Sequence, residues 1–209
     1  AKGDLATATN ALQKMLAWYS NRLDTAHAVL LTGQEIGRRG NPPGARQMFL
    51  DFAKSAPAPL LPELQLAVAA TYEQEKNWGE AIAQYDRWIA SYPSNAFRPR
   101  AEYYRALNIS DAGQKTNALT ALTKLVANFP KSEFAPLAQW CVANYYYNAD
   151  AWREAEGNYK LLFLSTNWAP SDLTYQAQLK AGRAAVALQS WNDAHDYFVG
   201  LFNNTNGPS

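Results

Sequence analysis

Apolar and small residues recur along this chain with a period of 36 to 39 positions. Each repeat contains an alanine, with a small residue twelve positions before it and large apolar or aromatic residues four and seven positions after it. Offsets of three, four and seven lie on one face of an α-helix, so the pattern predicts amphipathic helices. The five reference alanines are Ala45, Ala81, Ala118, Ala155 and Ala194.

Small residues and helix breakers divide each repeat into two helices. The small residue of the first helix is Gly or Ala, which lets two antiparallel helices approach closely. Turn residues such as those at 40–44 separate the two helices, and Pro57, Pro93 and Pro130 lie twelve positions after their alanines, where a second helix must end. The chain is therefore predicted to be all-α, built from antiparallel helix pairs. The small residues are Gly33, Ala69, Ala106, Ala143 and Gly182.

This arrangement resembles the tetratricopeptide repeat (TPR): a small residue and an aromatic in the first helix, alanine and an aromatic in the second, then a closing proline. The resemblance implies a right-handed superhelix, or solenoid, of five units. Residues 5–19, aligned through Ala8, predict the second helix of a partial N-terminal unit. We expect residues 1–209 to form a single array that is part of a longer protein, with units at about 26–59, 62–95, 99–132, 136–169 and 175–208.

Composition and motifs argue against several functions. A net charge of +1 with 18% charged residues provides no basic stripe for nucleic acid. No apolar run approaches the roughly 18 residues that span a bilayer. Cys141 is the single cysteine, and His27 and His195 are far apart in the sequence. We therefore expect no metal, no cofactor and no catalytic residues, and predict a non-enzymatic scaffold for protein–protein interaction.

Candidate binding residues follow from the resemblance, in which the first helices line the concave groove. The phase assigns to this face the positions 18, 15, 11, 8 and 7 before each alanine, which in the first three units include Leu30, Gln34, Glu63, Ala70, Gln74 and Arg100. Aromatic side chains flanked by amides and one arginine are typical of a binding hot spot. The same phase assigns Tyr85 and Tyr159 to the interior. The predicted peptide-binding set is Tyr103, Trp140, Asn144, Tyr147, Asn148 and Arg183.

Several alternatives remain open at this stage. Trp140 and Tyr103 could instead pack under a neighbouring helix. Some TPR proteins clamp the acidic terminus of a chaperone with a lysine four residues before a groove asparagine; here Trp140 stands four before Asn144, so that mode is not expected. A peptide segment or protein loop is the predicted partner.

Two further functions remain as alternatives: a glycan-handling or polymer-handling module of a bacterial envelope secretion system, and the regulatory arm of a larger enzyme. The missing polar capping helices also leave self-association through the ends open. Tyr92-Pro93 and Phe129-Pro130 resemble the closing residues of bacterial envelope TPR proteins, which favours the periplasm as the compartment.

Overall fold

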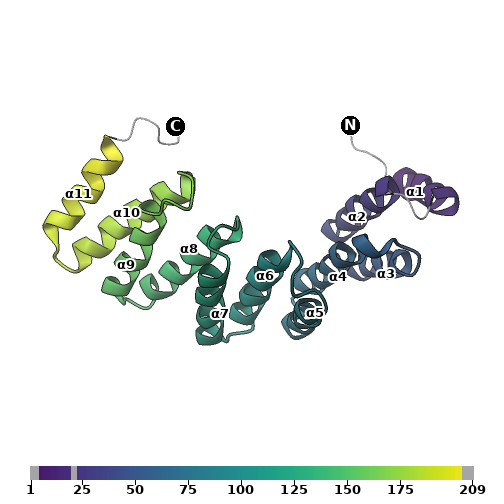
Figure 1. Cartoon of the computed structure of the whole chain (residues 1–209), viewed down its shortest axis with the longest axis horizontal. Coiled ribbons are helices and arrows are strands. Elements are labelled where there is room, and N and C mark those ends of the chain that lie inside the picture. Colours follow the sequence, from purple (N-terminus) through teal and green to yellow (C-terminus); the bar gives the residue numbers. More distant parts are fainter. Residues whose placement is uncertain (1–4, 20–22, 204–209) are drawn as a thin grey trace. The chain divides into compact units, whose positions relative to one another are not determined.

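The computed structural model describes residues 5–19 and 23–203 of the chain. Within these residues all regular structure is helical and no strand occurs. The chain divides into two compact units, Ala1–Ala112 and Gly113–Ser209 (Figure 1). The predicted fold class, an all-α repeat of antiparallel helix pairs, is confirmed. Residues 204–208 of the last predicted repeat lie outside the described residues.

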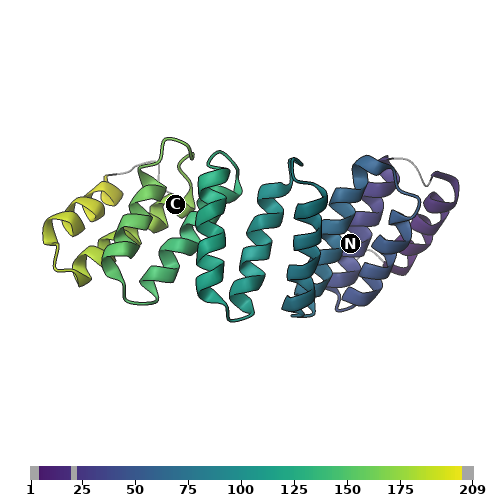
Figure 2. The same ribbon diagram turned by 60° about the horizontal axis from the view of Figure 1, so that its bottom comes forward.

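The first unit contains six α-helices and one 3-10 helix in its described part. Each helix packs against the next along the chain, and α2 also contacts α4. Successive helices alternate in direction (Figure 2). The elements are α1 (Leu5–Tyr19), α2 (Leu23–Arg38), α3 (Pro42–Ala53), η1 (Ala58–Leu60), α4 (Leu61–Gln74), α5 (Trp78–Ser91) and α6 (Arg98–Asp111).

The second unit contains five α-helices in its described part. Neighbouring helices pack against each other, and α8 also contacts α10 directly. The first helices of two consecutive pairs are thus side by side, with α9 packed against both. The elements are α7 (Lys115–Asn128), α8 (Phe134–Tyr147), α9 (Trp152–Phe163), α10 (Asp172–Ala187) and α11 (Trp191–Phe202).

The turn inside every helix pair uses the same backbone device. The residue five positions before each reference alanine has a positive φ, and only two of the five are glycines. At Lys76, for example, φ is 56°, and the next amide, that of Asn77, donates back to the Tyr72 carbonyl. This left-handed residue ends the first helix and reverses the chain. The five are Gly40, Lys76, Gly113, Asp150 and Gln189.

The small residue of the first helix makes room for a ring from the second. A Cβ added to Gly33 would lie 2.3 Å from Cε1 of Phe49, and one added to Gly182 would lie 2.4 Å from Cε1 of Phe198. Phe49 and Phe198 each lie four positions after their reference alanine. Where the small residue is Ala instead, the matching position is Tyr or Leu. The volumes of the two positions therefore compensate each other, as close packing requires.

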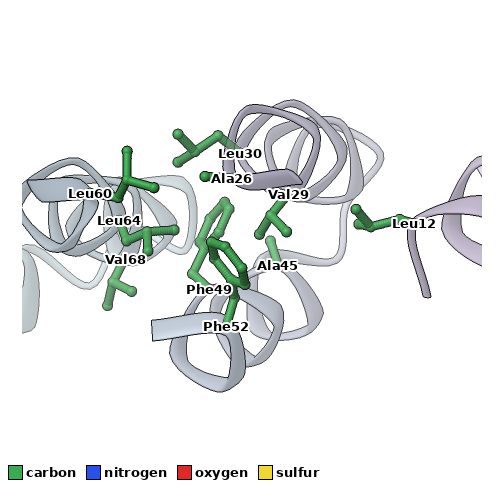
Figure 3. Packing of buried hydrophobic residues seen from close by; sticks show 10 residues of the cluster. All are labelled: Leu12, Ala26, Val29, Leu30, Ala45, Phe49, Phe52, Leu60, Leu64 and Val68. Carbon is green, nitrogen blue, oxygen red and sulfur yellow. The ribbon is translucent and has the colours of Figure 1, made fainter. Parts of the chain in front are cut away.

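The N-terminal core shows how the second helix fills the space between two first helices. Phe49 and Phe52 of α3 stand between Val29 of α2 and Leu64 of α4 (Figure 3). Both rings are almost completely buried. Ala45 lies at the close contact of α3 with α2, and all five reference alanines are buried. Among the described residues, no helix is long and apolar enough to cross a membrane.

Candidate functional site

The strongest candidate site lies on one face of α8 and α10 in the second unit. Residues three, four and seven apart place side chains of each helix on this face. Leu137, Leu179 and Val186 are exposed apolar residues there, and Arg183 and Asn148 are exposed polar residues. We call this surface the α8–α10 face; its residues are Leu137, Trp140, Asn144, Tyr147, Asn148, Leu179, Lys180, Arg183 and Val186.

Asn144 is the centre of the hydrogen-bonding network. Its Oδ1 accepts from the Tyr159 hydroxyl at 2.8 Å and from Lys180 Nζ at 2.6 Å. Its Nδ2 donates to the Trp140 carbonyl at 2.9 Å. An amide oxygen has two lone pairs and the NH₂ group has two donors, so one N–H is left for a ligand. Asn144 therefore mainly organises its neighbours.

Three aromatic rings surround the ammonium group of Lys180. Nζ lies 5.0 Å from the ring centroids of both Trp140 and Tyr147 and 5.8 Å from that of Tyr159. These distances fall within the range of cation–π attraction. The Trp140 and Tyr147 centroids lie 5.5 Å and 6.0 Å from that of Tyr159. We call the three rings the aromatic cage.

Burial shifts the protonation equilibria of the two polar groups in the cage. Burial, followed by repulsion from Arg183, lowers the pKa of Lys180. Burial, followed by Tyr147, raises the pKa of the Tyr159 hydroxyl, which therefore stays protonated and donates to Asn144. Desolvation acts against the charged form of each group.

The predicted binding residues are distributed over both units. Trp140, Asn144 and Tyr147 lie together on α8, where both rings are half-buried and pack against the core of the second unit. Asn148 is the exposed C-terminal cap of α8, and Arg183 lies exposed on α10. Tyr103 is half-buried on α6 of the first unit, 5.5 Å from the Tyr104 ring. A role of Tyr103 in binding stays a prediction.

Two residues of the network were not among the predicted binding residues. Lys180 lies fourteen positions before Ala194, outside the phase positions assigned to the groove. Its side chain reaches Asn144 of the preceding helix pair. Tyr159 is fully buried, as expected, but its hydroxyl and ring complete the site. The sequence signal that could have indicated Lys180 was its place directly after Leu179, a residue that the phase assigns to the groove.

The first unit has a small hollow on the corresponding face of its first helices. The hollow measures about 50 Å³. Small-molecule sites usually measure about 300–1,000 Å³, so this one has room for a side chain rather than for a cofactor. Several of its lining residues occupy the phase positions assigned to the groove: Leu30, Gln34, Glu63, Ala70, Gln74 and Arg100.

Glu73 of α4 is a half-buried carboxylate that lies eight positions before Ala81, one of the phase positions assigned to the groove. Its Oε1 accepts from Nδ2 of Asn108 at 2.6 Å, and the Tyr85 hydroxyl also bonds to it. Burial raises the pKa of Glu73, against the opposing effect of these bonds and of Arg100, while Asp111 adds to the rise. Ionised Glu73 therefore lowers the stability of the fold, because burial removes its carboxylate from water.

We expect Glu73→Gln to increase stability at neutral pH, and this gain to shrink in acid. The folded-state pKa of Glu73 lies above its ordinary value of 4.5. The wild type therefore gains stability as the pH falls through that raised pKa, and the glutamine variant lacks this gain. Urea unfolding at several pH values measures the difference. The exposed Glu80→Gln is the control, and a gain that is equal at pH 7 and pH 4 would contradict the expectation.

Within the described ranges, no group of three or more His, Cys, Asp or Glu side chains is placed to hold a metal ion. A second hollow of about 150 Å³ lies between the end of α9 and the start of α10, beside Trp168 and Tyr175. It is also smaller than a usual small-molecule site.

Comparison with known proteins supports the predicted resemblance. Residues 100–132 match the family model for the tetratricopeptide repeat. No curated protein matches the sequence significantly. BtubC (BKLC) from P. vanneervenii has a similar structure, with a TM-score of 0.73 and 11% identity, covering 98% of this chain and 92% of that one.

Two other solved structures show the same architecture. PilF of Pseudomonas aeruginosa has a TM-score of 0.63 at 16% identity, covering 98% of this chain and 86% of its own. A tetratricopeptide repeat protein from Parabacteroides merdae has a TM-score of 0.59 at 15% identity, covering 87% of this chain and 67% of its own. At such identities the similarity shows a shared fold only.

These observations define the class as all-α repeat proteins built from antiparallel helix pairs. Within that class, residues 100–132 match the tetratricopeptide repeat model, and the chain shares its fold with a solved tetratricopeptide repeat structure. Helical solenoids of this kind generally present extended surfaces to other proteins. The fold therefore supports a general role as a protein–protein interaction scaffold.

Proposed function

We propose that this protein is a non-enzymatic scaffold and that its α8–α10 face binds a segment of a partner protein. The observation that carries the proposal is the composition of that face. Exposed Leu137, Leu179 and Val186 adjoin the half-buried Trp140 and Tyr147 rings. Aromatic residues surrounded by apolar and cationic side chains are typical of interface hot spots.

The sizes of the hollows favour a macromolecular partner over a small molecule. Both are well below the volume that usually encloses a small ligand. A segment that lies across a face needs only shallow depressions for individual side chains. The α8–α10 face offers two adjacent helices with apolar side chains on both, which suits an extended or helical segment.

Glycan binding and enzyme regulation have less support. Lys180 lies over one face of the Trp140 ring and one face of the Tyr147 ring, which are surfaces that a sugar would stack on. No contact in the described part of the second unit favours regulation of an enzyme over general protein binding. The periplasmic compartment remains an expectation that rests on the resemblance alone.

A peptide-display experiment tests the proposed binding face. Phage displaying random twelve-residue peptides would be selected on the protein, and the enriched peptides synthesised for fluorescence anisotropy. We expect Leu179→Gln/Val186→Gln to weaken binding by about tenfold or more, because two apolar contacts are lost. The matched control is Leu161→Gln/Leu164→Gln. Both leucines are exposed; Leu161 lies on α9, and Leu164 directly follows that helix.

Two results would contradict the proposal. One is that no peptide is enriched. The other is that the control pair weakens binding as much as the α8–α10 pair does, because Leu161 and Leu164 are not on the proposed face. Circular dichroism of all variants would show that the helices are retained.

A further inference from the structure

Lys180 is a half-buried cation whose contacts among the described residues include no carboxylate. In the first unit, Arg46 pairs with Glu75 at 2.6 Å, Arg98 pairs with Glu102 at 2.8 Å, and Arg105 pairs with Asp86. Lys180 Nζ instead contacts an amide oxygen and three aromatic rings. In the described part of the second unit, neither Lys180 nor Arg183 forms an ion pair.

Arg183 adds a second positive charge one helical turn further along α10. Residues three apart on a helix are surface neighbours, so both cations face the same region. Arg183 is exposed, and its charge acts on Lys180 strongly enough to contribute to the lowered pKa. Two neighbouring cations without a carboxylate repel each other, and an anion between them would relieve that repulsion.

Two acidic groups of the neighbouring helices have other partners. Glu156 of α9 accepts from the Tyr197 hydroxyl at 2.7 Å, and Asp196 of α11 lies beside His195. Asp172 lies in the first turn of α10, and Glu154 in the first turn of α9. Among the charged groups, Arg183 is the one that shifts the pKa of Lys180. The α8–α10 face itself contains no acidic residue.

Apolar residues on both sides of Arg183 indicate where an anion would sit within a bound segment. Leu179 lies four residues before Arg183 and Val186 three after it, and both are exposed. A segment that covers both apolar residues continues past the cations in each direction. The anion is then in the middle of the segment rather than at a chain end.

We propose that the α8–α10 face recognises a segment with an internal glutamate or aspartate flanked by apolar residues, whose carboxylate binds Lys180 and Arg183. This inference rests on the proposed function and names the chemistry of the partner. The aromatic cage and Asn144 hold the Lys180 ammonium in place before binding. The carboxylate supplies the missing negative charge, and the apolar flanks cover Leu179 and Val186.

Three synthetic nonapeptide libraries test the inference. All are acetylated and amidated, with random uncharged residues and leucine on both sides of a central Glu, Gln or Lys. We expect the Glu library to bind about tenfold more tightly than the Gln library at low salt. The preference should decrease at high salt, because the cations are partly exposed. Fluorescence anisotropy measures each affinity.

Variants of the two cations separate this inference from the proposed function. Lys180→Met and Arg183→Gln should each bring the ratio of the Glu-library affinity to the Gln-library affinity close to one. Lys180→Arg should retain the preference. Lys160→Met changes a lysine of α9 near the Tyr197 ring and should have no effect. Arg183 is exposed, so its substitution leaves the fold intact.

The contradicting outcomes are distinct. Equal binding of the Glu and Gln libraries would overturn the acidic partner but keep segment binding. No binding by any library would overturn the proposed function as well. A preference for Glu that survives both Lys180→Met and Arg183→Gln would place the anion elsewhere. A further library consists of peptides cut short, so that a free C-terminal carboxylate stands at the central position. If it bound as tightly as the Glu library, the inference that the acidic residue is internal to the segment would be overturned.

Discussion

Replacing Trp88 with alanine is expected to lower the free energy of unfolding by about 3–5 kcal/mol. Trp88 lies on α5 with 1% of its surface exposed. Its indole N–H donates to the Pro62 carbonyl of α4 at 2.7 Å, and its ring lies 5.3 Å from that of Tyr92. Because α5 packs against both α4 and α6, the loss affects two helix interfaces. In repeat proteins such interfaces provide much of the stability.

Denaturant unfolding followed by circular dichroism measures this loss. Trp88→Phe separates packing from hydrogen bonding, because it keeps a ring but leaves the Pro62 carbonyl without its partner, at a cost of about 1–3 kcal/mol. Trp191→Ala is the control: Trp191 is 63% exposed, and we expect a change within about 0.5 kcal/mol. If Trp88→Ala proved no more harmful than Trp191→Ala, the packing described for α4, α5 and α6 would be wrong.

Much of the helical fold could be predicted because one physical requirement recurs in every repeat. A close contact between antiparallel helices needs a small residue, and the reference alanines supply it at regular spacing. The chain reversal five residues before each alanine was harder to specify. Lys76, Asp150 and Gln189 adopt the left-handed conformation although none is glycine. Their sequence neighbourhood indicated a turn, but not which residue would have a positive φ.

The candidate site could be predicted only in part. The phase placed Trp140, Asn144 and Tyr147 on one helix face, which follows directly from the period of an α-helix. It could not show that Lys180 reaches from the next helix pair to Asn144, because that contact depends on the distance between two first helices. The sequence could not tell whether the two rings are free or packed. In the structure they are half-buried, and Lys180 covers them.

Tyr159 shows why interior and binding residues are hard to separate from sequence. Its position after Ala155 assigns it to the core, and it is fully buried. Its hydroxyl nevertheless bonds to Asn144, and its ring lies beside both Trp140 and Tyr147. One side chain thus fills the core with its ring and organises the α8–α10 face with its polar end. Tyrosine is suited to this because it combines an apolar body with a polar tip.

Tyr159→Ala is accordingly expected to affect stability and the site together. Removing this ring should cost about 3–5 kcal/mol, as for other large buried aromatics. It also removes one wall of the aromatic cage, so Lys180 becomes more hydrated. Because burial is the main cause of the lowered pKa of Lys180, that pKa should return toward its ordinary value of 10.5. NMR titration of the lysine Cε signals measures the pKa, and denaturant unfolding measures the stability.

Tyr159→Phe and Tyr159→Leu distinguish the effect of the Tyr159 ring from that of its hydroxyl. Tyr159→Phe keeps the cage and leaves Lys180 bonded to Asn144, so the loss should be about 1 kcal/mol with the pKa of Lys180 still lowered. Tyr197→Phe is the matched control: it removes a hydroxyl bonded to Glu156, away from the cage. If the alanine variant unfolds, Tyr159→Leu keeps apolar volume in the core while removing the ring. A lowered Lys180 pKa that persists in Tyr159→Leu would show that the Tyr159 ring does not shield the ammonium, and the proposed link between core and binding face would fail.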